Sequence, residues 1–121
     1  KPVNMYNNEL VRGTLKTVVL KVLDDQPRMY GYQLSKEVKE RTDGKIVLTE
    51  GALYPILHKL QKDQLVTTEE EHIGKRVRKY YKLTDKGRKV ASEKTIELLD
   101  FMQTLALFIS RKPSVSYAIV R

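Results

Sequence analysis

Residues 49–65, TEGALYPILHKLQKDQL, decide how the rest of the sequence is interpreted. Thr49 is a suitable N-cap for a helix, and Glu50 then lies in the first turn, where the helix dipole favours an anion. Read as a helix, the stretch places four apolar side chains on one face at the i, i+3, i+4, i+7 spacing of a core-packed helix: Leu53, Ile56, Leu57 and Leu60.

The opposite face of this predicted helix is polar and basic. Tyr54, His58 and Lys62 follow one another at four-residue steps, with Gly51 beneath them and Lys59 alongside. Hydrogen-bond donors, an aromatic ring and cations on one face suit a helix that reads the major groove of DNA. An ordinary amphipathic helix with a solvated face produces the same pattern, so this stretch alone leaves both interpretations open.

The composition favours a polyanionic partner. With 121 residues, no internal repeat and a formal net charge of +8 at pH 7, the sequence predicts one basic domain. The absence of cysteine and the two isolated histidines argue against a metal site, and we expect no cofactor. No stretch resembles a signal peptide or reaches membrane-spanning length, so we expect a cytoplasmic protein and no membrane partner.

The segments around residues 49–65 predict a mainly α-helical domain with a small β-hairpin. Apolar periodicity predicts helices over residues 9–24 and 31–42, whereas residues 46–48 read as a brief strand or an extended linker. Alternation predicts two strands, 65–71 and 77–83, around a turn at Gly74. Three helices followed by a basic hairpin are the order of a winged helix-turn-helix, which we expect over residues 1–84.

The predicted hairpin, or wing, has acidic and basic parts. Its first strand carries three glutamates, residues 69–71, and cross-strand pairing with them is expected to occupy part of the charge of Arg78. Lys75 and Arg76 flank the turn beyond the reach of these glutamates. We therefore expect Lys75 and Arg76 to be the main wing contacts with a DNA minor groove or its phosphates, and Arg78 to be a further DNA contact with part of its charge.

A C-terminal helix over residues 85–110, for which Thr84 is the expected N-cap, differs in composition from the rest of the chain and is followed by a tail over 111–121. Its apolar residues cover more of the cylinder than one small domain can bury, so we expect a second copy of the chain to cover them. The positions expected at this dimer interface follow a 4-3-4 spacing: Leu98, Met102, Leu105 and Ile109.

Four motifs together resemble the PadR family of transcriptional regulators, in its compact subfamily with a single C-terminal dimerisation helix. They are Gly13-Thr14-Leu15, the tetrapeptide 29–32 (MYGY), residues 49–55 (TEGALYP) with 58–60 (HKL), and residues 78–87 (RKYYKLTDKG). The resemblance implies a homodimer that binds a palindromic operator in double-stranded DNA, as a repressor that a small-molecule effector releases.

On this basis we expect Tyr54 and His58 at or near base edges and Lys59 and Lys62 on phosphates. Gly51 would allow the N-terminus of the helix to approach the DNA backbone closely. For Tyr54 a structural role remains open, in which the ring packs on the preceding helix and exposes only its hydroxyl.

An effector pocket could lie between the first and last helices, lined by Val11, Leu15, Phe101, Met102, Leu105 and Phe108. Multidrug-sensing members of the compact subfamily stack planar ligands on a tryptophan, and this sequence has none. Pure dimer core is therefore the stronger interpretation of these residues.

The main functional alternative is a winged-helix module that binds protein without an effector response. An enzyme is rejected, because the sequence offers no nucleophile–base pair, no phosphate-binding glycine loop and no paired carboxylates in an apolar setting.

Overall fold

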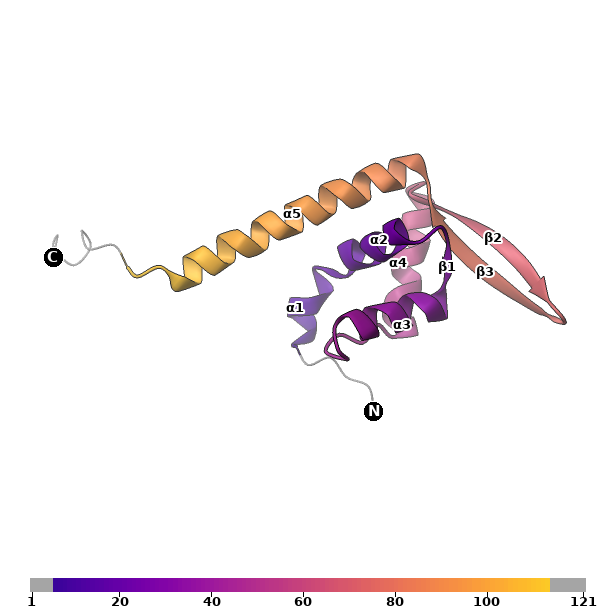
Figure 1. Cartoon of the computed structure of the whole chain (residues 1–121), viewed down its shortest axis with the longest axis horizontal. Coiled ribbons are helices and arrows are strands. Elements are labelled where there is room, and N and C mark those ends of the chain that lie inside the picture. Colours follow the sequence, from indigo (N-terminus) through magenta and orange to yellow (C-terminus); the bar gives the residue numbers. More distant parts are fainter. Residues whose placement is uncertain (1–5, 114–121) are drawn as a thin grey trace.

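The computed structural model describes residues 6–113 and contains a mainly helical fold with a small antiparallel sheet (Figure 1). Along the chain the elements are α1 (Asn8–Arg12), α2 (Leu15–Asp25), β1 (Met29–Tyr30), α3 (Gly31–Arg41), α4 (Glu50–Lys62), β2 (Val66–Ile73), β3 (Arg76–Leu83) and α5 (Asp85–Ser110). The predicted winged helix-turn-helix order, followed by one long C-terminal helix, is confirmed.

The first predicted helix, residues 9–24, is wrong as a single element. The structure divides it into α1 and α2 at Gly13 and Thr14. Both the amide and the hydroxyl of Thr14 donate to the carbonyl oxygen of Val11, at 2.9 and 2.8 Å. These bonds compete with the regular helical pattern, and Gly13 has a weak preference for a helix interior. The helix starts at Asn8, one residue before the predicted start, and the Asn7 side chain caps it by accepting from the Glu9 amide at 2.8 Å.

The core lies where α2, α3 and α4 meet the base of the sheet. The predicted inner face of α4 is confirmed, since Leu53, Leu57 and Leu60 are buried and Ile56 is half-buried against the core. The base of the hairpin contributes three buried side chains to this core: Val66, Tyr81 and Leu83. Beyond this base, β2 and β3 project away from the helices (Figure 1).

The sheet has three strands in the order β1-β3-β2, all antiparallel. Of the two alternatives for residues 46–48, the linker is correct. The additional strand is β1, where Met29 pairs with Tyr81 and Tyr30 with Tyr80. A two-residue strand is too short to show alternation, so the sequence pattern did not reveal it.

The long helix α5 starts at a tight junction with the sheet. Thr84 caps it, as predicted, by accepting the Gly87 amide on its hydroxyl oxygen at 2.9 Å. Ala91 is buried where α5 packs on α2, and the helix then continues past the rest of the fold (Figure 1). Of the predicted tail, residues 111–121, only 111–113 lie within the described range. Between residues 6 and 113, no helix has both the length and the apolar character needed to cross a membrane.

Candidate nucleic-acid interface

The outer face of α4 presents the predicted polar row to solvent. His58, Lys59 and Lys62 are exposed, and Tyr54 is 37% exposed. A Cβ atom added at Gly51 would meet only the Thr49 hydroxyl oxygen, at 4.0 Å. The start of this face is therefore open to the approach of a partner.

Tyr54 also has a packing role within the fold. A Cβ atom built on Gly31, the first residue of α3, would lie 2.5 Å from the Tyr54 hydroxyl oxygen. The ring therefore lies directly over the start of α3 while more than a third of the residue stays accessible. The packing alternative is thus correct in placing the ring on the preceding helix, but it was wrong to expect the hydroxyl as the only exposed part, because the hydroxyl is the end that lies against Gly31.

An open groove of about 440 Å³ joins the outer face of α4 to the wing. We call it the α4–wing groove, and its lining comes from β1, the start of α3, α4 and β3: Tyr30, Gly31, Tyr32, Tyr54, His58, Val77, Arg78, Lys79 and Tyr81. It brings together three residues that the sequence assigned to DNA, Tyr54, His58 and Arg78. The aromatic and cationic lining suits a polyanion that carries flat bases.

Tyr32 and Lys79 line this groove without having been assigned to the site from the sequence. Tyr32 is 69% exposed, and the Lys79 ammonium lies 5.8 Å from the centroid of the Tyr81 ring. The alternation of β3 contained a signal, because Tyr81 is buried and Val77 and Lys79 share its face of the strand. The tertiary structure was needed to show which face of the wing lies toward α4.

The cations assigned to phosphates differ in how free they are. Lys59 pairs with Asp63 at 3.3 Å on the exposed side of α4. Lys62 has no ion pair within residues 6–113, and the same is true of Lys75 and Arg76 at the exposed wing tip. Among the cations predicted to contact DNA phosphates, Lys62, Lys75 and Arg76 therefore have most of their charge available for a phosphate.

The expected neutralisation of Arg78 by the wing glutamates does not take the form of an ion pair. Glu71 stands opposite Arg78 in the ladder, but the Arg78 guanidinium lies over the Tyr30 ring, 4.1 Å from its centroid. Its hydrogen bond with the Tyr80 hydroxyl is the main reason that the pKa of Arg78 is raised further above its ordinary value. Glu69 and Glu71 are bound instead by Arg28.

Arg28, just before β1, donates to Glu69 at 3.2 Å and to Glu71 at 2.9 Å. The hydrogen bond with Glu71 is the largest cause of a raised pKa at Arg28. Its guanidinium lies 3.8 Å from the centroid of the Tyr80 ring, and Tyr80 meets Tyr30 edge-on at 5.5 Å. On the outer face of the sheet, two tyrosine rings thus meet edge-on, and each carries one arginine guanidinium.

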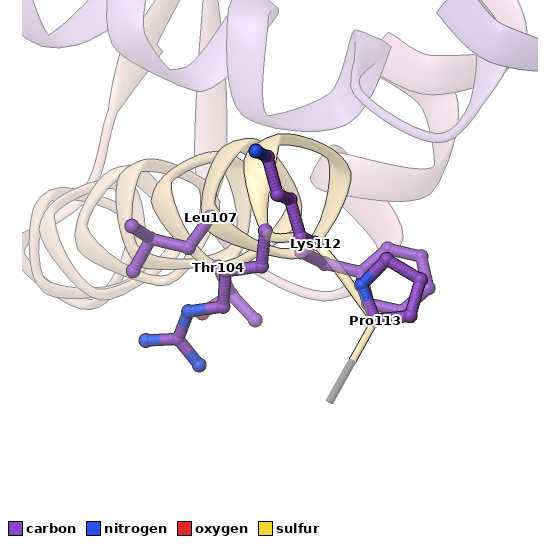
Figure 2. A pocket seen from close by; sticks show the side chains of 6 residues that line it. Thr104, Leu107, Lys112 and Pro113 are labelled. Atoms are coloured by element: carbon purple, nitrogen blue, oxygen red, sulfur yellow. The ribbon is translucent and has the colours of Figure 1, made fainter. Parts of the chain in front are cut away.

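The residues expected to line an effector pocket lie in separate places in the single chain. Val11 and Leu15 line a hollow that is completed by α4 residues and contains none from α5. Phe108 lines a different hollow at the end of α5, with Thr104, Leu107, Arg111, Lys112 and Pro113 (Figure 2). Phe101, Met102 and Leu105 are exposed on α5. One chain therefore does not assemble the six residues.

The positions expected at a dimer interface form a stripe that continues the packed face of α5. Leu98 is half-buried beside α2 and α3, whereas Met102, Leu105 and Ile109 are 55%, 42% and 78% exposed. The same stripe includes Ala91, which is buried on α2. Its outer part lacks a covering element among the described residues.

Comparison with known proteins identifies the family. Residues 19–93 match the model of the transcriptional regulator PadR-like family. The chain belongs to the PadR-like family. The matched range runs from α2 through α4 and both long strands into α5, so it includes the whole α4–wing groove.

Solved structures of PadR-like and related regulators have the same fold. A transcriptional regulator from Clostridium thermocellum superposes with a TM-score of 0.78 at 26% identity, over 87% of this chain and 99% of the other. A PadR family regulator from Eggerthella lenta gives 0.75 at 30% identity, over 86% and 88%. The transcriptional regulator YqjI of Escherichia coli K12 is 38% identical over 77 residues, 62% of this chain but 34% of that longer protein.

Membership of the PadR-like family makes this chain a DNA-binding transcriptional regulator. The family and its structural relatives are regulators and not enzymes. In helix-turn-helix proteins in general, the second helix of the motif is the one that lies in the major groove.

Proposed function

We propose that this PadR-like protein is a sequence-specific, dimeric repressor, whose α4 helix enters the major groove of a palindromic operator. The observation that supports it most is the α4–wing groove, where the exposed edges of Tyr54 and His58 share one open surface with Arg78 and Lys79. Aromatic and imidazole groups can contact base edges while the cations neutralise phosphates.

Each part of the site has a separate role in this proposal. Tyr54 and His58 contact bases, Lys59 and Lys62 hold the flanking phosphates, and Gly51 lets the start of α4 approach the DNA backbone. Lys62 contributes more than Lys59, because Lys59 shares its charge with Asp63. The wing tip supplies two further contacts, Lys75 and Arg76, to the adjacent minor groove or its phosphates.

The dimer places two copies of α4 on successive major grooves on one side of the duplex. In a symmetric dimer these two helices must lie about one turn of DNA apart, ~34 Å. The exposed stripe of α5 supports such an assembly, since Met102, Leu105 and Ile109 would otherwise remain in water.

A small apolar effector would act at the same seam. Phe101, Met102, Leu105 and Phe108 are exposed in the single chain, so they are accessible to a ligand until a partner covers them. Val11 and Leu15 would join this pocket only if the second copy approaches α1 and α2. A ligand bound there would change the separation of the two α4 helices and release the operator.

The test begins with selection of bound fragments from a pool of random duplexes, followed by affinity measurements on the selected site and on unrelated DNA. His58→Ala should weaken binding to the selected site roughly tenfold, with little change on unrelated DNA, because a base contact carries sequence information. Lys62→Ala should weaken both about equally and lower the slope of log affinity against log salt by about 0.9.

Lys94→Ala provides the matched control for Lys62→Ala. Lys94 pairs with Glu97 on α5, far along the chain from the α4–wing groove, and its removal should leave both affinities unchanged. If the unsubstituted protein recovers no duplex at low salt, the DNA-binding proposal fails, and a protein-binding winged helix becomes the better interpretation.

A further inference from the structure

The outer face of the wing is held by one arginine that lies outside it. Arg28 is attached to the start of β1, its guanidinium lies 3.8 Å from the centroid of the Tyr80 ring on β3, and it binds Glu69 and Glu71 on β2 at 3.2 and 2.9 Å. A single side chain therefore connects all three strands of the sheet.

The wing needs a restraint of this kind because its outer half has no core. Ile73 and Val77, on either side of the turn, are 40% and 52% exposed. The strands project away from the helices beyond their base (Figure 1). A two-stranded hairpin is only marginally stable by itself in water. The direction of its tip is therefore set by the contacts nearest the base.

The Arg28 contact has the geometry to set that direction. Glu69 and Glu71 are two residues apart, so both side chains leave the same face of β2. The rigid fork of the guanidinium donates to both carboxylates while its flat face lies on Tyr80. A lysine at this position would keep the charge but would lack the fork and the flat face.

Arg28 also explains how a DNA-facing wing tolerates two of its three glutamates, Glu69 and Glu71. The two carboxylates on the outer face are drawn toward the base of the sheet by Arg28. The basic residues of the tip, Lys75 and Arg76, have no ion pair with any described residue between positions 6 and 113. The acidic base and the basic tip of the wing are thereby kept apart.

We propose that Arg28 is a positioning residue for DNA binding: it holds the hairpin at the angle from which Lys75 and Arg76 reach the duplex. Two of its N–H groups donate to Glu69 and Glu71, so in this proposal it acts by holding the wing and not by touching DNA. This inference rests on the proposed DNA-binding role of the wing.

The test compares Arg28→Ala, Lys75→Ala/Arg76→Ala and the triple variant across a salt series on one duplex. Arg28→Ala should lower affinity and reduce the salt slope by about the same amount as the two tip substitutions, about 0.9 for each phosphate that the wing no longer neutralises. In the triple variant, adding Arg28→Ala to the two tip substitutions should weaken binding no further than the tip substitutions do alone. Arg28→Lys should behave like Arg28→Ala, because charge alone does not fix the angle.

Arg41→Ala is a matched control away from the wing. Arg41 also binds two carboxylates, Glu37 at 2.7 Å and Asp25 at 2.8 Å, where the ends of α2 and α3 meet. Its removal should lower thermal stability without changing the salt slope. Amide hydrogen exchange adds a second readout, because Arg28→Ala should accelerate exchange in β2 and β3 while leaving α4 protected.

Three results would overturn the role of Arg28. They are a wild-type affinity and slope in Arg28→Ala, weaker binding by the triple variant than by the tip double variant (which would indicate direct contact with DNA), and full rescue by Arg28→Lys (which would indicate simple charge compensation). A lack of DNA binding by the unsubstituted protein is a different outcome, since it contradicts the proposed function and removes the basis of this inference with it.

Discussion

At the scale of one residue, Gly87 occupies a position that has no room for a side chain. It lies in the first turn of α5, where a Cβ atom would overlap the carbonyl oxygen of Leu65 and lie 3.1 Å from a methyl carbon of Leu83. The same carbonyl oxygen accepts hydrogen bonds from the amide and the hydroxyl of Thr84, at 3.0 and 3.2 Å. A larger residue must therefore disturb the junction between the sheet and α5.

Gly87→Ala should destabilise the protein by about 1–3 kcal/mol, the usual cost of overpacking a tight contact. Urea unfolding monitored by circular dichroism would measure the change. Gly13→Ala is the matched control, because a Cβ atom there meets nothing within 4 Å and should leave the midpoint nearly unchanged. Equal midpoints for wild type and Gly87→Ala would contradict the packing argument.

The ion pairs of Asp25 predict a dependence of stability on pH. The hydrogen bond from Arg41 is the main reason that the pKa of Asp25 lies below its ordinary value of 3.8, and Lys21 adds to the effect. Because the folded pKa is lower than the unfolded one, the stabilisation is complete above that ordinary value and is lost as the pH falls through the folded pKa. Asp25→Asn should lower the Tm at neutral pH, and its deficit should shrink below about pH 4. A deficit that stays constant with pH would exclude this ionisation as the cause.

At the scale of the element, α4 combines a buried apolar face with an open polar face. The sequence pattern predicted both faces correctly, since a helical period of 3.6 residues fixes which side chains share a side. The pattern could not show that Tyr54 packs over Gly31, because that contact joins residues of two helices. The open start of α4 at Gly51 has a direct consequence for binding.

Gly51→Ala should preserve or slightly raise stability, since alanine is the better helix former by roughly 0.5–1 kcal/mol and the site has room. It should nonetheless weaken DNA binding several-fold, because the added methyl group separates the start of α4 from the DNA backbone. Affinity on the selected duplex is the measurement, with Gly13→Ala as control. Unchanged affinity in Gly51→Ala would remove this glycine from the interface.

At the scale of the whole molecule, α5 connects the DNA-binding unit to a surface that one chain leaves open. Its apolar stripe starts at the buried Ala91 and passes through the half-buried Leu98. It then reaches residues that are largely exposed, of which Leu105 and Ile109 are examples. A helix whose packed face continues beyond its own domain is typical of a protein that buries that face in a second copy.

Leu105→Glu should convert the proposed dimer into a folded monomer with much weaker operator affinity. In a symmetric interface each substitution occurs twice, so two carboxylates would be buried or brought close together. Analytical ultracentrifugation would give the mass. Thr104→Glu is the matched control, because it adds the same charge one residue away, on the side of α5 that carries Asp100 and Glu97. This variant should remain dimeric. A dimeric Leu105→Glu protein with wild-type affinity would rule out this seam.

The sequence by itself determined the order of the main helices and the hairpin, the two faces of α4, the caps at Thr49 and Thr84, and the basic wing tip. These features depend on local periodicity and on hydrogen bonds between near neighbours, which residue order fixes directly. Only the tertiary structure decided that β1 completes the sheet, that Arg28 and not Arg78 binds the wing glutamates, and that Lys79 and Tyr32 share a groove with α4. Arg28 is 41 and 43 residues from its two partners. Contacts at such separations follow from how the sheet and helices pack together, and no local pattern in the chain records that packing.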